Sequence, residues 1–283
     1  MTSYIEIKGQ QIQVLSTDPT DLVEGQVWYN STQPGTFKAF TFNAIIPGTF
    51  AVGGNMGSCR RYMGGGGTQN AGVGFGGNTT PGGVNCATTE EYNGSAWTAG
   101  GTMTTARKSV GGAGTQNAAL AFAGYSTANS NATEEYDGTS WTAGGNLATA
   151  RLRLGAAGTQ NAALGFGGYA PGTVCCTEEY NGTSWTAGGN LPTGRRNQGA
   201  AGTQNAALGF GGYEPGQVGA CSSQEYDGST WTAGGNMVQK RKDLNGAGTQ
   251  LSALGFGGYL YGNRTEEYTK TLSSTTTKTI TIS

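Results

Sequence analysis

Residues 177–190 read "TEEYNGTSWTAGGN", and nearly the same letters recur at 133–146 as "TEEYDGTSWTAGGN" and at 88–101 as "TTEEYNGSAWTAGG". In each copy, a run ending in tyrosine and a run opening with tryptophan flank an Asn-Gly or Asp-Gly dipeptide. Such dipeptides supply the two positive φ angles of a type I′ turn, whose twist suits two antiparallel strands. The stretch therefore predicts a β-hairpin that the chain builds several times.

The hairpin is part of a longer repeat. The tripeptide GTQ recurs at intervals of 47, 44, 44 and 46 residues, beginning at Gly67, Gly114, Gly158, Gly202 and Gly248. Each unit has four runs of strand length: a small-residue run such as "LGAAGTQ", an apolar run such as "AALGFGGY", a run ending "EEY" and a run containing "SWTAGG". We call these expected strands a, b, c and d. Four strands with a period in the forties predict one blade of a β-propeller.

The two ends of the repeat region complete each other. The fifth unit reaches "RTEEY" but then has Thr269-Lys270 in the hairpin position and no later tryptophan, so its strand d is missing. Upstream, "FAVGGNMGSCRR" at 50–61 matches "WTAGGNLATARL" at 141–152, with Phe50 in the place of tryptophan. We therefore expect the strand at Phe50 to join the fifth unit and to close an all-β ring of five blades over residues 49–268, since closure protects strand edges. Where five strands converge near one axis, only small side chains such as those of "GAAG" fit.

Composition and charge narrow the classes of function. Glycine contributes 53 of 283 residues, which excludes a mainly helical chain because each helical glycine costs about 1 kcal/mol. The formal net charge is −1 without long charge runs, so neither nucleic acid nor an anionic membrane is an expected partner. No run approaches eighteen apolar residues, so we expect no membrane insertion. Five cysteines, an odd number, imply no disulfide framework, and without histidine we expect neither a metal site nor a cofactor.

In combination, the repeat motifs resemble the kelch family. A double glycine ends strand b, a tyrosine closes strand c, a tryptophan opens strand d, and an arginine follows, as in "ATAR". The resemblance covers about residues 50–268 and implies that strand a is innermost and strand d outermost. Larger side chains then pack between neighbouring blades, and we assign this structural role to Phe50, Trp97, Trp141, Trp185 and Trp231.

The segments outside the ring differ from it. Residues 1–48 alternate at period two and then predict a hairpin over Pro34-Gly35, which indicates a small β adaptor. Its stretch "EGQVWYNST", Glu24 to Thr32, resembles segments near the start of tail-fibre and other virion proteins of marine bacteriophages. Several such proteins are also similar in carrying glycine-rich kelch-like repeats of the "SWTAGGNL" kind. Residues 269–283 form either a further strand or a polar tail.

Recurring charged residues raise the question of chemistry. Paired carboxylates stand at Glu90-Glu91, Glu134-Glu135, Glu178-Glu179 and Glu266-Glu267, with Gln224-Glu225 in the fourth unit. A glycosidase needs two carboxylates across one bond, whereas adjacent strand residues point to opposite faces. Without histidine there is no Ser-His-Asp arrangement, and no phosphate-binding loop motif occurs. We therefore expect structural pairing, no catalytic residue and no enzyme.

An arginine stands seven residues before each GTQ glycine. These arginines are Arg60, Arg107, Arg151, Arg195 and Arg241. Two interpretations stay open: one structural hydrogen-bonding role in each blade, or guanidinium groups, those of Arg107, Arg151, Arg195 and Arg241 among them, that circle the axis and hold an anionic ligand.

The copies differ mainly at one end. Antiparallel strands place the a–b and c–d turns on one face, here the turn face, and the b–c and d–a connections on the other, here the loop face. The turn face is nearly invariant, whereas the b–c connections vary in length and composition, and in repeat proteins such variation often maps to a binding face. We expect binding by Tyr125, Tyr169, Tyr213, Tyr259 and Tyr261, with Arg153, Arg196 and Lys240 nearby. The alternative is that these tyrosines only cap the blades.

The resemblances and the loop face together lead to an expected function. We expect a non-enzymatic structural protein located in a bacteriophage virion, with residues 1–48 bound to other virion proteins and the propeller displayed on a tail fibre or tail tip. There it contacts a glycan or protein of the host surface. The alternatives are a capsid-surface decoration or fibre protein and a free, lectin-like propeller of a bacterium. Assembly as a homo-oligomer is compatible with each of these.

Overall fold

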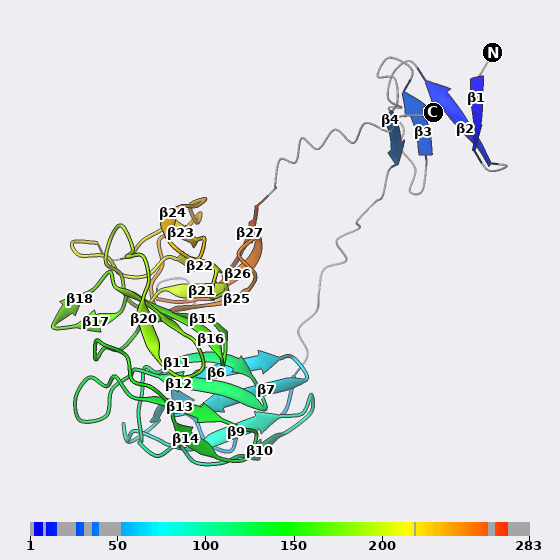
Figure 1. Ribbon diagram of the computed structural model, residues 1–283. Coiled ribbons are helices and arrows are strands. Elements are labelled where there is room, and N and C mark those ends of the chain that lie inside the picture. Colours follow the sequence, from blue (N-terminus) through cyan, green and yellow to red (C-terminus); the bar gives the residue numbers. More distant parts are fainter. Residues whose placement is uncertain are drawn as a thin grey trace. The chain divides into compact units, whose positions relative to one another are not determined.

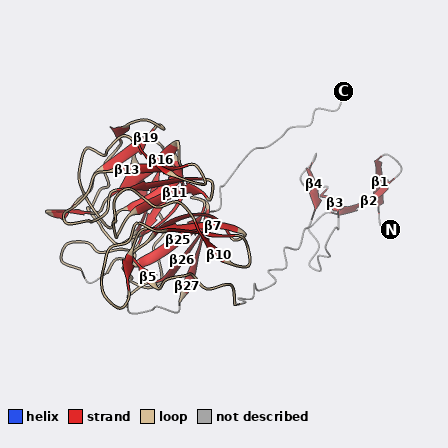
Figure 2. Cartoon of the chain, turned by 90° about the horizontal axis from the view of Figure 1, so that it is seen from below, coloured by secondary structure: helices blue, strands red, loops and turns tan. Residues whose placement is uncertain are grey.

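The computed structural model describes residues 3–7, 10–15, 27–30, 36–39, 52–217, 219–259 and 264–270. Contacts divide the chain into two compact units, Met1–Ala51 with Leu272–Ser283, and Val52–Thr271. Every element of regular structure in the described residues is a β-strand, as the colours of Figure 2 show, so the all-β prediction is confirmed. Within these residues no helix is long and apolar enough to cross a membrane.

The first unit contains one four-stranded sheet. Its strands β1 (Ser3–Ile7), β2 (Gln10–Leu15), β3 (Val27–Asn30) and β4 (Thr36–Ala39) lie in that order. Antiparallel β3 and β4 form the hairpin that the sequence predicts, although Pro34-Gly35 lie outside the described residues. The parallel pairing of β2 with β3 has no signal in the sequence.

The second unit is a five-bladed β-propeller, in which the strands of each blade follow one another as an antiparallel meander, a to d in blades one to four and a to c in the described part of blade five (Figure 1). Blade one contains β6 (Gly64–Thr68), β7 (Ala71–Phe75), β9 (Thr89–Tyr92) and β10 (Trp97–Ala99), and blade two contains β11 (Gly111–Thr115), β12 (Ala118–Phe122), β13 (Thr133–Tyr136) and β14 (Trp141–Ala143). Blade three contains β15 (Gly155–Thr159), β16 (Ala162–Phe166), β19 (Thr177–Tyr180) and β20 (Trp185–Ala187). Blade four contains β21 (Gly199–Thr203), β22 (Ala206–Phe210), β23 (Ser223–Tyr226) and β24 (Trp231–Ala233), and blade five contains β25 (Leu244–Gly248), β26 (Ser252–Gly257) and β27 (Thr265–Thr269). Two short ribbons lie in the connections, β5 (Arg60–Arg61) with β8 (Asn78–Thr79), and β17 (Tyr169–Ala170) with β18 (Gly172–Thr173).

The strands a are innermost, as expected. β6, β11, β15, β21 and β25 contact one another in succession, and their small residues, such as Gly65, Ala156 and Ala200, line the central space. At Gly112 a Cβ would stand 2.5 Å from the backbone nitrogen and oxygen of Gly65, and at Gly246 it would stand 2.3 Å from the backbone oxygen of Ala200. The small-residue runs are therefore a consequence of strand convergence at the axis.

The c–d hairpins are correct in place but differ in geometry from the predicted type I′ turn. Tyr180 pairs directly with Trp185, so four residues form each loop, and only the glycine of the dipeptide has a positive φ. The preceding side chain takes over part of the turn: Asn181 Oδ1 accepts hydrogen bonds from the backbone N–H groups of Thr183 and Ser184. Because Asn and Asp accept such bonds without adopting a positive φ, the same dipeptides suit this longer loop.

Aromatic stacking joins neighbouring blades. Trp185 of blade three lies over Phe122 of blade two, with ring centroids 4.8 Å apart, and its Nε1–H donates to Thr133 Oγ1 at 2.9 Å. Equivalent aromatic contacts join Phe75 with Trp141, edge to face, and Phe166 with Trp231 in a tilted arrangement. Leu164, Phe166 and Tyr180 are fully buried between blades. The predicted packing role of Trp141, Trp185 and Trp231 is therefore the one the structure has.

Polar side chains reinforce the same interfaces. Gln160, from the GTQ tripeptide of blade three, donates to the carbonyl oxygens of Ala119 and Tyr136 in blade two, at 3.1 and 2.6 Å. The hydroxyl of Tyr180 donates to Glu135 of blade two. The other successive blades are joined by matching contacts. The glutamines are Gln116, Gln204 and Gln250, and the tyrosines are Tyr136, Tyr226 and Tyr268.

Blade five is different. It has three strands in the described residues, and a cavity of about 180 Å³ lies at its outer edge, lined by Phe210, Ser223 and Tyr268 where other blades hold a tryptophan. Phe50, the predicted occupant, lies outside the described residues, so ring closure by its strand stays a prediction. The described residues that follow Phe50 are consistent with that prediction, because they make the contact of a d–a connection. The N–H of Gly57 donates to Glu90 Oε2 at 2.6 Å, and in the following blade the N–H of Thr104 donates to Glu134 in the same way.

Candidate functional site

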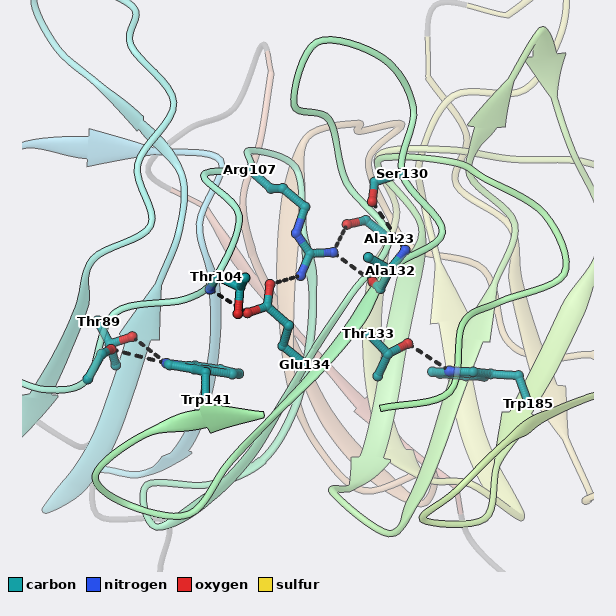
Figure 3. A network of polar contacts seen from close by, with 11 residues as sticks. Thr89, Thr104, Arg107, Ala123, Ser130, Ala132, Thr133, Glu134, Trp141 and Trp185 are labelled. Carbon is teal, nitrogen blue, oxygen red and sulfur yellow. Dashed lines mark hydrogen bonds and ion pairs between the residues drawn. The ribbon is translucent and has the colours of Figure 1, made fainter. Parts of the chain in front are cut away.

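Each d–a connection of the propeller carries one arginine whose side chain is buried against the following blade, and Figure 3 shows Arg107 as the example. Arg107 is 0% exposed, and its Nη1 donates to the carbonyl oxygens of Ala123 and Ala132 at 2.8 and 2.6 Å. Its Nη2 donates to Glu134 Oε1 at 2.8 Å, while the backbone N–H of Thr104 donates to the other carboxylate oxygen. The guanidinium group of Arg107 thus holds both ends of a b–c connection, while its ion pair with Glu134 fixes it on strand c of the same blade.

The ion pair recurs in every blade, with one substitution of the carboxylate. In blade three, Arg151 donates to Gly165 O and Cys176 Sγ in place of two carbonyl oxygens of the connection. Arg60, Arg151 and Arg241 pair with Glu90, Glu178 and Glu266 at 2.7, 2.7 and 2.8 Å. In blade four Gln224 occupies the position of that glutamate, and Arg195 pairs instead with Glu214 of the b–c connection at 2.7 Å. The sequence contains this exchange, since Gln224 and Glu214 are each unmatched in the other units.

The burial of these arginines decides between the two interpretations that the sequence left open. The side chains of Arg107, Arg151, Arg195 and Arg241 are 0–1% exposed and ion-paired within their blades. Burial lowers the pKa of Arg107 and of Arg195, and the adjacent Glu134 and Glu214 carboxylates oppose that effect. Their geometry supports a structural role and leaves the guanidinium groups without access to an anionic ligand.

The loop face carries a second set of contacts, one residue further along the chain. There the d–a and b–c connections pair as short antiparallel bridges, for example Lys108 with Tyr125 and Arg196 with Tyr213. The cation of each such bridge lies over a tyrosine ring: Lys108 Nζ is 5.3 Å from the centroid of Tyr125, and Arg196 Cζ is 4.4 Å from that of Tyr213. The backbone pairing therefore sets cations and aromatic rings side by side.

These contacts continue from blade to blade. Arg196 also lies over Tyr169 of the preceding blade, at 4.7 Å, and Lys242 lies over Tyr213 and Tyr259, at 5.8 and 4.9 Å. The five side chains alternate as ring, cation, ring, cation, ring across blades three to five. We call Tyr169, Arg196, Tyr213, Lys242 and Tyr259 the cation–tyrosine ladder.

Inside the ladder, five residues with φ between 54° and 58° surround the axis. They are Tyr62, Ser109, Arg153, Asn197 and Asp243, one from each d–a connection. Successive members are joined by backbone hydrogen bonds, for example from Asn197 N–H to Arg153 O at 3.0 Å. All five line a cavity of about 680 Å³ at this end. Equivalent backbone positions thus present five different side chains around one opening.

Charge is distributed unevenly between the two faces. The connections of the loop face hold two carboxylates, Glu214 and Asp243, and Glu214 is paired with Arg195. Exposed or half-buried cations of the same connections are Arg61, Lys108, Arg153, Arg196, Lys240, Lys242 and Arg264. The turn face of blades one to four holds Asp137 and Asp227 and no cation. Hydrogen bonds from the Ser140 backbone and the Thr139 hydroxyl hold the pKa of Asp137 well below its ordinary value. The loop face is therefore the cationic one in a chain whose net charge is −1.

Sequence reasoning located this face but only some of its residues. The structure brings Tyr169, Tyr213 and Tyr259 together in the ladder and places Tyr125 beside Lys108, whereas Tyr261 lies outside the described residues. Lys242 and the axial residues of positive φ other than Arg153 were missed. The sequence could have indicated them, because each lies one or two positions after the arginine that recurs in every repeat.

The fold and this face define the class of protein, a five-bladed β-propeller with a variable, cationic loop face. No protein-family model matches the chain, and no curated protein matches it either.

Proposed function

We propose that the chain is a non-enzymatic structural protein of a bacteriophage particle, which displays its propeller on a tail fibre or tail tip so that the loop face contacts the host surface. The observation that carries the proposal is the difference between the two faces. The turn face repeats one loop around the ring, while the loop face combines unlike connections, exposed tyrosines and cations, of which Arg196 and Lys242 form no ion pair with a described carboxylate. Such a surface suits recognition of an external partner.

The N-terminal unit supports display on a particle. It is a separate small sheet, and its stretch "EGQVWYNST" resembles segments near the start of tail-fibre and other virion proteins of marine bacteriophages, several of which carry similar glycine-rich, kelch-like repeats. In the proposal this unit, residues 1–48, binds other virion proteins. A location on the capsid surface is the alternative, because the same layout serves there.

The carboxylates support a role without catalysis. The first glutamate of a pair, such as Glu134, is held by a buried arginine, and the second, such as Glu135, accepts a hydrogen bond from a tyrosine of the next blade. The two side chains lie on opposite faces of their strand, as adjacent residues must. The pairs of blades one to three therefore serve blade packing in two directions, and this arrangement differs from two carboxylates that face one glycosidic bond.

Immunogold electron microscopy tests the location. An antibody raised against the purified protein is applied to purified particles of the phage that encodes it, with particles of an unrelated phage as the control. We expect gold at the tail. Label over the capsid would select the capsid alternative, and unlabelled particles together with free protein in the medium would favour the lectin-like bacterial protein instead.

A further inference from the structure

We propose that the cation–tyrosine ladder is a binding site for an acidic polysaccharide, one whose sugar units carry carboxylate groups. This inference rests on the proposed function in one respect, since it names the ligand class that the displayed loop face would recognise. The ladder is Tyr169, Arg196, Tyr213, Lys242 and Tyr259, and it spans three blades along the loop face.

The two cations of the ladder are held in place by tyrosine rings but are not neutralised by a described carboxylate of the protein. Arg196 and Lys242 are half-buried, and each lies between two tyrosine rings, which restricts the orientations of its side chain. Neither forms an ion pair with a described carboxylate, in contrast to Arg195 and Arg241, which directly precede them and pair with Glu214 and Glu266. A prepositioned cation without a partner favours binding of an anionic group.

The spacing along the ladder indicates an extended ligand. Its members come from successive blades, and exposed tyrosines stand at both ends, with Tyr169 36% and Tyr259 54% exposed. Phenol hydroxyl groups donate and accept hydrogen bonds, as sugar hydroxyl groups do, while the ring edges offer apolar contact. A chain of acidic sugars presents the same alternation of carboxylates and hydroxyl groups that the ladder would bind.

Single-stranded nucleic acid is the competing polyanion, and the ladder geometry disfavours it. Stacking of bases requires open aromatic faces. Here Arg196 covers one face of both Tyr169 and Tyr213, and Lys242 lies over Tyr213 as well. A cation of the protein already lies over each of these rings, which reduces the aromatic area open to bases and leaves charge and hydroxyl groups for recognition.

Binding of immobilised alginate, a carboxylated polysaccharide, to the purified full-length protein tests the proposal. The test variant is Arg196→Leu with Lys242→Leu, chosen because blade three has Leu152 at the same position and keeps the same backbone bridge, from Leu152 to Tyr169. We expect the wild type to bind alginate and not the neutral polysaccharide dextran, with affinity that falls as salt rises. The double variant is expected to bind at least about tenfold more weakly.

A matched control separates the ladder from net charge. Asp137→Asn with Asp227→Asn changes two charges on the turn face, where the chain itself has Asn93 and Asn181. We expect its alginate affinity to stay within about twofold of the wild type. If the double leucine variant loses its thermal unfolding transition, Arg196→Gln with Lys242→Gln replaces it, with the same expectation.

Three results would overturn the proposal: equal alginate binding by the wild type and the ladder variant, binding of dextran as strong as that of alginate, or oligo(dT) displacing alginate at lower concentration than soluble alginate does. The result is independent of the particle test. Failure here with gold at the tail refutes the ligand class alone, whereas ladder-dependent alginate binding with unlabelled particles refutes the display proposal alone.

Discussion

The interface between blades two and three and the seam between blade five and blade one contain the same residue types but different contacts. At the first, Trp185 stacks on Phe122 and Gln160 donates to two carbonyl oxygens of the preceding blade. At the seam, Trp97 and Gln69 occupy the equivalent positions, and among the described residues neither makes the corresponding contact with blade five. Phe256, which would receive Trp97, is 37% exposed, whereas Phe122 is fully buried.

The difference teaches what a repeat contributes to stability. Each blade buries its apolar face only against a neighbour, so the same side chain stabilises the fold more where it contacts that neighbour than where it does not. Leu120 and Phe122 of blade two are fully buried against the next blade, whereas their counterparts Leu254 and Phe256, at the seam, are partly exposed. The following variants test this contrast.

The largest expected effect is at the aromatic stack. Trp185→Ala should lower the free energy of unfolding by about 3–5 kcal/mol, because it removes a stacked indole and leaves a cavity between two blades. Trp97→Ala, its matched control at the seam, should cost about 1–2 kcal/mol, since Trp97 contacts the Tyr92 ring of its own blade but no aromatic ring of blade five. Urea unfolding measures both. Equal losses would mean that the seam is packed like the other interfaces.

Phe50→Ala tests whether the strand before Val52 completes blade five. If Phe50 enters the cavity lined by Phe210, Ser223 and Tyr268, the substitution should lower the free energy of unfolding by about 1.5–3 kcal/mol, the usual gain from burying such a ring. Phe37→Ala, in β4 of the other unit, controls for the loss of a phenylalanine outside the propeller. An unchanged unfolding midpoint of the propeller would contradict closure by this strand.

The glutamine of the GTQ tripeptide provides a smaller contrast. Gln160→Ala leaves the carbonyl oxygens of Ala119 and Tyr136 without their donor and should cost about 1–2 kcal/mol. Gln69 is exposed, so Gln69→Ala should change the free energy of unfolding by less than about 0.5 kcal/mol. Thermal unfolding followed by circular dichroism distinguishes the two, and a cost at Gln69 equal to that at Gln160 would argue against the contrast.

The smallest expected effect appears in alkali. Burial, together with the hydrogen bonds to Glu91 and Glu135, raises the pKa of Tyr136 and of Tyr180 to about 12. Because the unfolded chain loses these protons near pH 10, their contribution is complete below about pH 10 and is lost as the pH rises toward about 12. A tyrosinate absorbance titration of the folded protein should show these phenols ionising last. Tyr180→Phe should flatten the loss of stability over that range, and an unchanged slope would contradict the assignment.

Much of the fold was predictable because its causes are local. Alternation and turn residues indicated the strands and the c–d hairpins, and the count of GTQ tripeptides indicated five blades. The turn type was wrong, because the four-residue loop after Tyr180 has Asn181 as a hydrogen-bond acceptor at a negative φ, and the dipeptide alone does not reveal loop length. The parallel pairing of β2 with β3 was not predicted, since it joins strands that no turn connects.

The candidate site was predictable only in part. Variation among the b–c connections pointed to the loop face and to Tyr169, Tyr213 and Tyr259. The arginines were harder to assign, because a recurring arginine suits a ligand site and a structural clamp equally well until its burial is known. Arg195 illustrates this, since its partner Glu214 comes from a connection rather than from the strand position that serves the other blades.

By itself, the sequence determined the strand pattern, the number of blades and the face on which the copies differ, because periodicity and turn chemistry act between residues close along the chain. Only the tertiary structure decided that the recurring arginines are buried in ion pairs while the next residues, Arg196 and Lys242, remain without carboxylate partners beside tyrosines of adjacent blades. Those roles depend on contacts between units roughly forty residues apart. Which side chain of one blade contacts the next blade depends on how the blades are arranged in the ring, and the sequence of a single repeat does not specify it.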